Sequence, residues 1–209
     1  KAAMPKVDSE YELVYTVFGS GDVVVEGRFT PGRGKLPDMP RFGMQMTLPA
    51  GFDTITWFGR GPHETYCDRR DARVGLYRGP VDEQYYADYS EPGESGNKVD
   101  VPWTAVTNRD GVGLLAVSMP LLSVNALPYT TDDLQGPKHT HEIPRRGYTT
   151  LNLDLKQMGL GGDNSWGAQP HDEYKIRPEA QSYRFRLRPF QAGDEPPFDS
   201  AATVLPSVP

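Results

Sequence analysis

The residues with the clearest potential for acid–base chemistry lie in one segment, where His63 and Glu64 are followed by Asp68 and Asp71. An imidazole beside several carboxylates can transfer protons as a general acid and base. Four arginines lie around them in the sequence: Arg60, Arg69, Arg70 and Arg73. Such mixtures of charge more often form structural ion-pair networks than catalytic sites, so we favour the network.

A second segment, His139-Thr140-His141-Glu142, places two imidazoles on one side of the chain if it is extended. A zinc site needs a third ligand, and the sequence shows no matching second motif. A solvated or hydrogen-bonded loop is the favoured interpretation, and no metal site is expected. The sequence has no Gly-x-Ser-x-Gly motif and Cys67 lacks a convincing set of partners, so nothing specific supports nucleophilic catalysis.

A glycine-rich stretch, residues 158–167, follows an alternating segment that predicts a strand over residues 149–155. Three glycines in four positions let the backbone turn freely, and Asp163, Asn164 and Ser165 can bond to the loop's own amides. Asp163 and Asn164 could also bind Ca²⁺, but the acidic spacing of an EF-hand loop is absent. Trp166 is either a plug in the core or an exposed platform for a ligand. Because tryptophan is highly buried on average, local sequence alone favours the plug.

Other aromatic side chains offer further flat faces on which a sugar could stack. They are Trp57, Trp103, Tyr85, Tyr86 and Tyr89. Sugars present apolar C–H faces to aromatic rings while their hydroxyl groups form hydrogen bonds. The alternative is that most of these rings belong to the core of a β-sandwich, and for Trp57 and Trp103 we favour that alternative.

Composition restricts the class of protein. The 209 residues include 22 glycines, 20 prolines and 11% aromatic residues, with few amphipathic runs of helical length, which predicts one all-β domain. The net charge of −6 argues against nucleic acid as a partner. No apolar run is long enough to span a membrane, so no membrane partner is expected. The single cysteine excludes an internal disulfide framework but leaves the compartment open.

Alternating apolar and polar residues predict the strands. Residues 11–18 and 23–30 are expected to form a hairpin, and further strands are expected at 41–48, 53–59, 99–103, 112–118, 121–126 and 183–188. Residues 59–97 are expected to form a long irregular region, which in a compact domain is usually functional. The tail from residue 191, with four prolines, is expected to be poorly ordered, leaving a domain over residues 1–190.

Taken together, these stretches resemble the C-terminal domain, also called the small-chain domain, of the bacterial β-galactosidases of glycoside hydrolase family 2. The most specific matches are Trp57-Phe58-Gly59-Arg60-Gly61-Pro62-His63-Glu64-Thr65-Tyr66 and residues 157–167. Smaller matches run in the family's order: Arg41-Phe42-Gly43-Met44, Asp68-Arg69, Val74, Gly75 and Tyr77 in outline, Gly96-Asn97, Asp100, Leu134 and His139. The likeness covers residues 10 to 190.

The resemblance implies a large antiparallel β-supersandwich, similar to the fold of galactose mutarotase. In the family, the tryptophan of the Gly-Gly-Asp-x-Ser-Trp motif contacts the aglycone or acceptor sugar, so the resemblance implies a platform role for Trp166 and reverses the preference for a plug. It implies Asp163, Asn164 and Ser165 as further substrate-binding residues. His63, Glu64 and His139 are secondary candidates.

The family's two catalytic carboxylates come from a barrel domain that this chain lacks, so the resemblance implies no hydrolysis by this chain alone. It implies as partners the catalytic barrel domain of the same enzyme or a large subunit, together with a galactoside sugar. Full-length members commonly use Mg²⁺ and Na⁺ bound mainly elsewhere, so no cofactor is expected here. A cytoplasmic and a periplasmic location in a bacterium both stay open.

Two departures from the family put local loop geometry in question. Pro92-Gly93-Glu94-Ser95-Gly96 stands where Pro-Gln-Glu-Asn-Gly is usual, and Pro102 precedes Trp103 where an arginine is usual.

Two other functions stay open. One is a free-standing carbohydrate-binding module, and the other is a mutarotase-like aldose epimerase that uses His63 or His139, which rests on fold analogy alone.

Overall fold

The computed structural model describes residues 2–4, 8–164, 166–193 and 197–205. Its N-terminal hairpin is the one expected from the sequence. Strand β2 (Ser9–Val17) pairs antiparallel with β3 (Val23–Thr30), and Val17 lies opposite Val23. The turn closes with a hydrogen bond from the Phe18 amide to the Asp22 carbonyl, and Gly21 adopts a φ of 87° that favours glycine.

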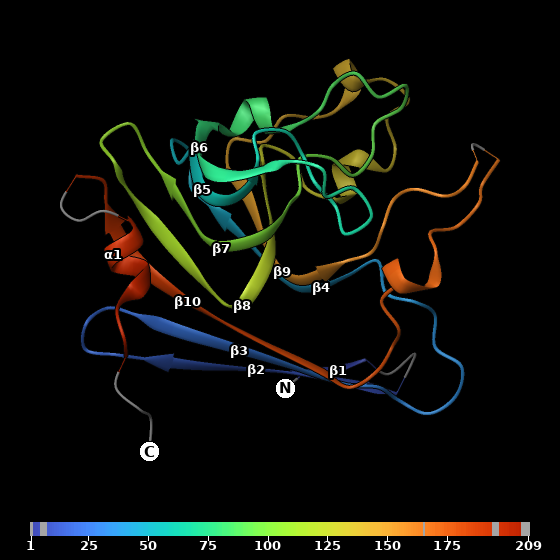
Figure 1. Cartoon of the computed structure of the whole chain (residues 1–209), viewed down its shortest axis with the longest axis horizontal. Helices are drawn as coiled ribbons and strands as arrows, with labels where there is room; N and C mark the ends of the chain where they lie inside the picture. Colours follow the sequence, from blue (N-terminus) through green and yellow to red (C-terminus); the bar gives the residue numbers. More distant parts are fainter. Residues whose placement is uncertain (1, 5–7, 165, 194–196, 206–209) are drawn as a thin grey trace.

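All the described strands belong to one antiparallel sheet (Figure 1). Its main path runs β1-β2-β3-β10-β8-β7-β5-β6, and β9 adds a branch that joins β8 to β4. The remaining strands are β1 (Ala2–Met4), β4 (Arg41–Leu48), β5 (Thr54–Gly61), β6 (Arg73–Pro80), β7 (Lys98–Thr107), β8 (Val112–Leu127), β9 (Thr149–Gln157) and β10 (Gln181–Gln191). The expected all-β antiparallel class is confirmed.

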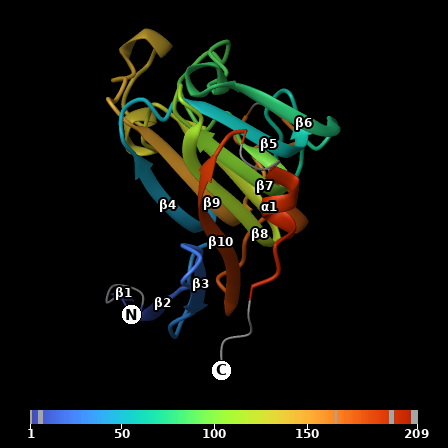
Figure 2. The ribbon, with the colours of Figure 1, turned by 90° about the vertical axis from the view of Figure 1, so that its left-hand side faces the viewer.

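Strand β8 connects the two parts of the sheet. Its first half, through Met119, pairs with β10, and its second half, from Ser123 to Leu127, pairs with β9. The β4–β9 pair thereby faces the sheet made by β2, β3 and β10 (Figure 2). The ring of Phe42 on β4 marks this packing, because it lies 5.2 Å from the ring of Tyr183 on β10 and 6.1 Å from that of Phe29 on β3. The result is a sandwich whose layers share a strand.

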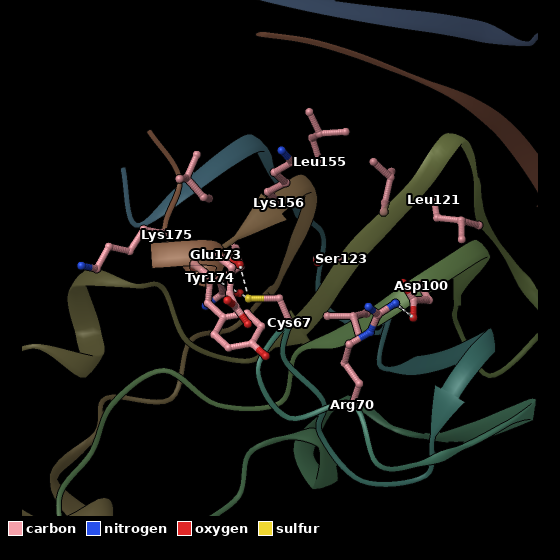
Figure 3. A pocket seen from close by; sticks show the side chains of 14 residues that line it. Cys67, Arg70, Asp100, Leu121, Ser123, Leu155, Lys156, Glu173, Tyr174 and Lys175 are labelled. Carbon is pink, nitrogen blue, oxygen red and sulfur yellow. Dashed lines mark hydrogen bonds and ion pairs between the residues drawn. The ribbon is translucent and has the colours of Figure 1, made fainter. Parts of the chain in front are cut away.

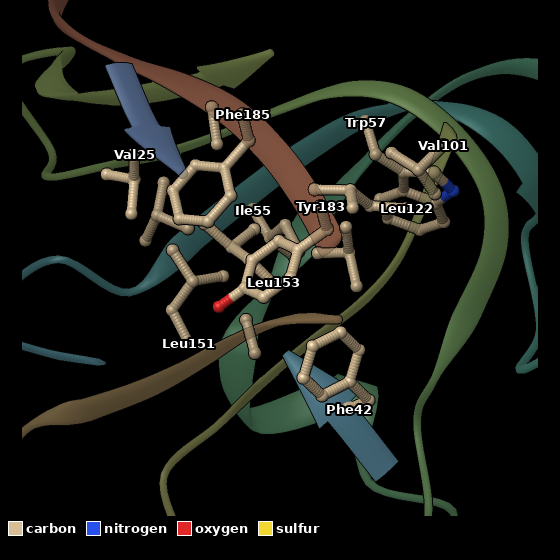
Figure 4. Close-up of a cluster of buried hydrophobic side chains, with 14 of the residues drawn as sticks. Val25, Phe42, Ile55, Trp57, Val101, Leu122, Leu151, Leu153, Tyr183 and Phe185 are labelled. Carbon is tan, nitrogen blue, oxygen red and sulfur yellow. The ribbon is translucent and has the colours of Figure 1, made fainter. Parts of the chain in front are cut away.

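The main core fills the space between the layers (Figure 4). Val25, Leu153 and Phe185 are fully buried, and they come from β3, β9 and β10. Trp57 and Trp103 are each 2% exposed, which confirms that both are core residues and not sugar platforms. Trp57 stacks on Tyr77 at 5.3 Å and donates its indole N–H to the Arg60 carbonyl at 2.9 Å.

The expectation of an irregular region over residues 59–97 is wrong in part, because β6 forms there and pairs with β5 along its whole length. Its sequence is hard to recognise as a strand. Two glycines interrupt it, proline ends it, and Val74 and Leu76 are 59% and 57% exposed, as at a sheet edge. The segments expected as separate strands at 112–118 and 121–126 are one continuous strand.

Short helical turns lie between the strands. They are the 3₁₀ turns η1 (Val81–Gln84), η2 (Asp132–Leu134), η3 (Thr140–Glu142) and η4 (Asp172–Tyr174), with one α-helix, α1 (Pro197–Ala202). None of the helices in the described ranges has the length and apolar character needed to cross a membrane.

The described part of the segment beyond residue 190 contacts the sheet. The ring of Phe198 in α1 lies 5.3 Å from Trp103 and 5.0 Å from Phe58, and the Arg186 guanidinium donates to the Thr203 carbonyl at 2.7 Å. The division of the chain at residue 190 and the poor order of the tail stay predictions.

Candidate functional site

The glycine-rich loop after β9 is fastened to the body of the domain at three points. The Met158 amide donates to the Pro40 carbonyl at 3.0 Å, and the Gly159 amide donates to the Tyr174 carbonyl at 2.9 Å. The Gly161 amide donates to Oδ2 of Asp68 at 2.7 Å. A Cβ at Gly159 would lie 2.7 Å from that same oxygen, so this close approach requires glycine. The loop therefore leaves the sheet in a defined direction.

The end of the loop presents Trp166 to solvent. The side-chain oxygen of Asn164 accepts a hydrogen bond from the Trp166 amide at 2.8 Å, and Gly167 follows with a φ of 88°. Trp166 is 92% exposed, so the plug favoured by local sequence alone is excluded. An exposed indole on an anchored loop is the arrangement that the platform interpretation requires. Ser165 lies outside the described residues.

Asp163 is held by a residue that the sequence did not single out. Its Oδ1 lies 2.8 Å from Nε2 of His171, and this contact raises the pKa of the imidazole because the carboxylate stabilises its charged form. The His171 ring also stacks near Tyr174, at 6.5 Å. The two sides of the loop are thus joined. Sugar contacts by Asp163, Asn164, Ser165 and Trp166 stay predictions.

Glu64 is at the centre of a hydrogen-bond network between β5 and β7. Its Oε1 accepts hydrogen bonds from Tyr89 and, at 3.0 Å, from Arg69. Its Oε2 accepts the Gly96 amide at 2.7 Å and the Ser95 hydroxyl at 3.1 Å. Burial, the largest single influence, raises the pKa of Glu64, but these donors outweigh it and hold the pKa below its ordinary value.

Three of the four neighbouring arginines, Arg60, Arg69 and Arg70, are paired with carboxylates, as the network interpretation expects. Arg60 Nε lies 2.7 Å from Oδ2 of Asp100, which also binds Arg70 at 2.5 Å. The Arg69 guanidinium lies 5.0 Å from the centre of the Tyr66 ring. His63 is exposed, and its Nε2 lies 3.3 Å from the Asp71 carbonyl oxygen. Neighbours in sequence, His63 and Glu64 thus have separate hydrogen-bond partners.

His139 lies on a different loop, at the start of η3. The side chain of Glu142 accepts the backbone amides of Lys138 and His139 at 2.8 and 3.1 Å, and the rings of His139 and His141 stack at 5.6 Å. This is the hydrogen-bonded loop favoured from the sequence. Within the described ranges, no group of three or more His, Cys, Asp and Glu side chains is placed to hold a metal ion.

Cys67 borders a cavity of about 310 Å³ between the loop after β5 and the end of β9 (Figure 3). Its thiol donates to the Gln157 carbonyl at 3.4 Å, and burial raises the pKa of the thiol. A raised pKa disfavours the thiolate, which is the nucleophilic form. The geometry therefore gives Cys67 a packing role.

The variant segment 92–96 is tied to the opposite layer by a buried charge cluster. Arg41 on β4 lies 3.1 Å from Oδ2 of Asp154 on β9 and 3.8 Å from Oε1 of Glu94. Burial raises the pKa of Asp154 to about 7 and also raises that of Glu94, and the opposing effect of Arg41, which the two carboxylates share, does not cancel it. Ser95, which stands where the family has asparagine, is fully buried and bonds to Glu64.

The other departure, Pro102, lies where the register of β7 against β8 shifts on both sides of Val101. Proline lacks an amide donor, and within sheets it is found at such irregular positions. The substitution is therefore compatible with the strand.

Fold and site together define the class of protein: an all-β sandwich domain that presents an aromatic side chain on an anchored loop at one edge. Residues 1–188 match the family model of the β-galactosidase small chain. The chain belongs to the β-galactosidase small-chain family.

The curated relatives are much longer than this chain. A β-galactosidase of Priestia megaterium is 40% identical over 165 residues, which are 78% of this chain and 16% of the relative. A β-galactosidase of Halalkalibacterium halodurans is 35% identical over 172 residues, 80% of this chain and 17% of the relative. The β-galactosidase BgaC of Bifidobacterium adolescentis is 35% identical over 147 residues, 68% of this chain and 14% of the relative. The chain thus matches less than a fifth of each.

Proposed function

We propose that this chain is the accessory domain of a β-galactosidase and completes the substrate site of that enzyme. The observation that carries the proposal is the exposure of Trp166, 92%, on a loop that is anchored at both ends. Tryptophan side chains are highly buried on average, so one that is almost fully exposed indicates a binding role. The flat indole can stack on the apolar C–H face of a sugar ring. The sugar bound there is the one attached to galactose, or an acceptor in its place.

The loop provides hydrogen-bond acceptors beside the indole. Asp163 and Asn164 each use one side-chain oxygen within the loop, and both residues are exposed. Sugar hydroxyl groups can form hydrogen bonds with the other side-chain polar atoms of Asp163 and Asn164. We expect the hydroxyl group of Ser165 to bond to the sugar as well. These residues would orient the sugar, and Trp166 would supply the apolar contact.

The catalytic carboxylates would come from another part of the enzyme, a catalytic barrel domain or a large subunit. Retaining hydrolysis needs two carboxyl groups about 5 Å apart, one of which is an acid with a raised pKa. Glu64 has a lowered pKa and is already bound by five donors, and the pKa of Glu142 is lowered by two backbone amides. Asp154 has a raised pKa but is 2% exposed. We expect the metal ions of the enzyme to be bound elsewhere as well.

A free-standing carbohydrate-binding module is the second candidate, because the same exposed indole supports it. Such a module would bind galactosides without a partner chain. An aldose epimerase has less support, since His63 and His139 are exposed and lie on separate loops.

The proposal is tested by assaying nitrophenyl-β-galactoside hydrolysis with the purified 209-residue chain. We expect no activity alone, and activity when a partner chain containing the catalytic barrel is added. Hydrolysis that persists through repurification of the single chain would place the active site here and contradict the proposal. Glu64, Asp68 and Glu142 would then be the residues to replace.

A further inference from the structure

A second hollow lies beside the Trp166 loop, and we propose that it is a separate binding site for a neutral saccharide. It has a volume of about 680 Å³ and is lined by residues of two loops, including His63, Asp68, Asp71, Tyr86 and Tyr89. We call it the tyrosine hollow. Both loops lie between β5 and β7 and gather at one end of the sheet (Figure 1). The volume is within the range of small-molecule sites.

Two tyrosines form the aromatic wall of the tyrosine hollow. Tyr86 is 48% exposed, and its ring meets that of Tyr89 edge to face at 4.9 Å. The wall is held in place from behind, because the Tyr89 hydroxyl bonds to Glu64 and lies 3.1 Å from the Arg69 guanidinium. The Tyr86 amide donates to the Ser95 hydroxyl at 2.7 Å. A fixed, exposed ring of this kind offers a stacking surface at low entropic cost.

The tyrosine hollow is also lined by polar groups that can form hydrogen bonds with the hydroxyl groups of a sugar. Asp68 uses Oδ2 to hold the Gly161 amide, while its Oδ1 is buried with no hydrogen-bond partner among the described residues. This oxygen can accept a hydrogen bond from a sugar hydroxyl group once the Asp68 side chain turns it toward the hollow. His63 and Asp71 are exposed on the lining and offer further donors and acceptors.

The charges of the tyrosine hollow select the class of sugar. Arg69 is paired with Glu64, and Arg70 shares Asp100 with Arg60, so the three carboxylates of the lining (Glu64, Asp68 and Asp71) outnumber its two arginines. An acidic sugar would be repelled by these carboxylates. A neutral mono- or disaccharide is the ligand that fits both the charge and the aromatic wall.

The inference rests on the proposed function, because that function supplies the class of ligand, a sugar. The residues of the tyrosine hollow are different from those of the Trp166 loop. Asp68 touches both places, since it binds the Trp166 loop and lines the tyrosine hollow. A longer galactoside or a second sugar could occupy the hollow while Trp166 contacts the first. The two sites can therefore be separated by substitution.

The test is a titration of the full 209-residue chain, in which binding is measured by ligand-observed NMR. Lactose and methyl β-glucoside are the neutral probes, and galacturonate is the acidic probe. In the Trp166→Ala variant, both neutral probes should still bind and galacturonate should bind more weakly. Adding Tyr86→Ala should then lower the affinity for the neutral probes roughly five- to tenfold. Tyr15→Ala, which removes a 55% exposed tyrosine from β2, is the matched control.

Two results would overturn the inference: no binding of either neutral probe to Trp166→Ala, or unchanged affinity after Tyr86→Ala. If Tyr86→Ala weakens folding, Asp71→Ala removes an exposed acceptor from the lining and should lower the affinity without that complication. A Trp166→Ala substitution that leaves substrate binding by the complete enzyme unchanged would instead contradict the proposed function and leave the tyrosine hollow standing.

Discussion

The backbone amide of Gly161 donates a hydrogen bond to the side chain of Asp68, which lies 93 positions earlier in the chain. This contact joins the loop that carries Trp166 to the loop that carries His63 and Glu64. Its distance of 2.7 Å and the carboxylate acceptor make it a strong hydrogen bond. The segment directly after the first of the two most specific motifs therefore contacts the second motif.

The Glu64 network should be essential for the stability of that edge. In Glu64→Gln, the amide group would bring new donors to a position surrounded by Arg69, Tyr89 and the Gly96 amide, so at least one donor loses its acceptor. We expect a loss of about 2–3 kcal/mol in the free energy of unfolding, measured with urea. Glu83→Gln, on an exposed position of η1, should change it by less than about 0.5 kcal/mol. Equal effects of the two substitutions would refute the role of the network.

Glycine at position 162 should be required for the placement of Trp166. A Cβ there would lie 2.0 Å from the Ala168 carbonyl oxygen and 2.6 Å from its carbon, so the backbone must shift. Gly162→Ala should therefore weaken disaccharide binding by the complete enzyme roughly five- to tenfold, as removal of the indole would. Gly136→Ala is the control, because a Cβ at Gly136 meets no atom within 4 Å. Normal binding by Gly162→Ala would show that the loop conformation does not matter.

The buried carboxylate of Asp154 should make stability depend on pH. Burial raises its pKa to about 7, whereas an unfolded Asp ionises near pH ~4. Between these values the folded chain holds a proton that the unfolded chain has lost, so stability falls as the pH rises from about 4 to about 7. Asp154→Asn cannot ionise and should show a flatter dependence in urea unfolding over this range. The exposed Asp88→Asn should keep the wild-type dependence. If Asp154→Asn also keeps it, the titrating group is another one.

Much of the fold could be predicted from alternation in the sequence. The hairpin of β2 and β3 follows the pattern of apolar and polar residues because one face is turned to the core. Strand β9 alternates as well, although its residues from Thr149 to Asp154 are buried on both faces. Strand β6 could not be predicted in this way, since its exposed Val74 and Leu76 lie at a sheet edge, where the core does not determine the pattern of residues. The union of two expected strands into β8 depends on partners far away in the sequence, β9 and β10.

The candidate site could be predicted only where its contacts are local. The hydrogen bond from the Trp166 amide to the side-chain oxygen of Asn164 spans two residues and follows from the known turn chemistry of Asn. The exposure of Trp166, by contrast, is opposite to the average behaviour of tryptophan, and only the resemblance to a family indicated it. His171 and Glu94 act through tertiary contacts, with Asp163 and Arg41, that no spacing in the sequence reveals.

The most direct test of the account is Trp166→Ala in the complete enzyme, with steady-state kinetics on lactose and on a nitrophenyl galactoside. Because Trp166 is 92% exposed, the substitution should leave folding intact. Leu160→Ala, which shortens a 41% exposed apolar side chain of the same loop, is the control. We predict that KM for lactose rises roughly five- to tenfold while kcat on the nitrophenyl substrate changes by less than about twofold. A large loss of turnover on the nitrophenyl galactoside, with lactose binding almost unchanged, would contradict the account.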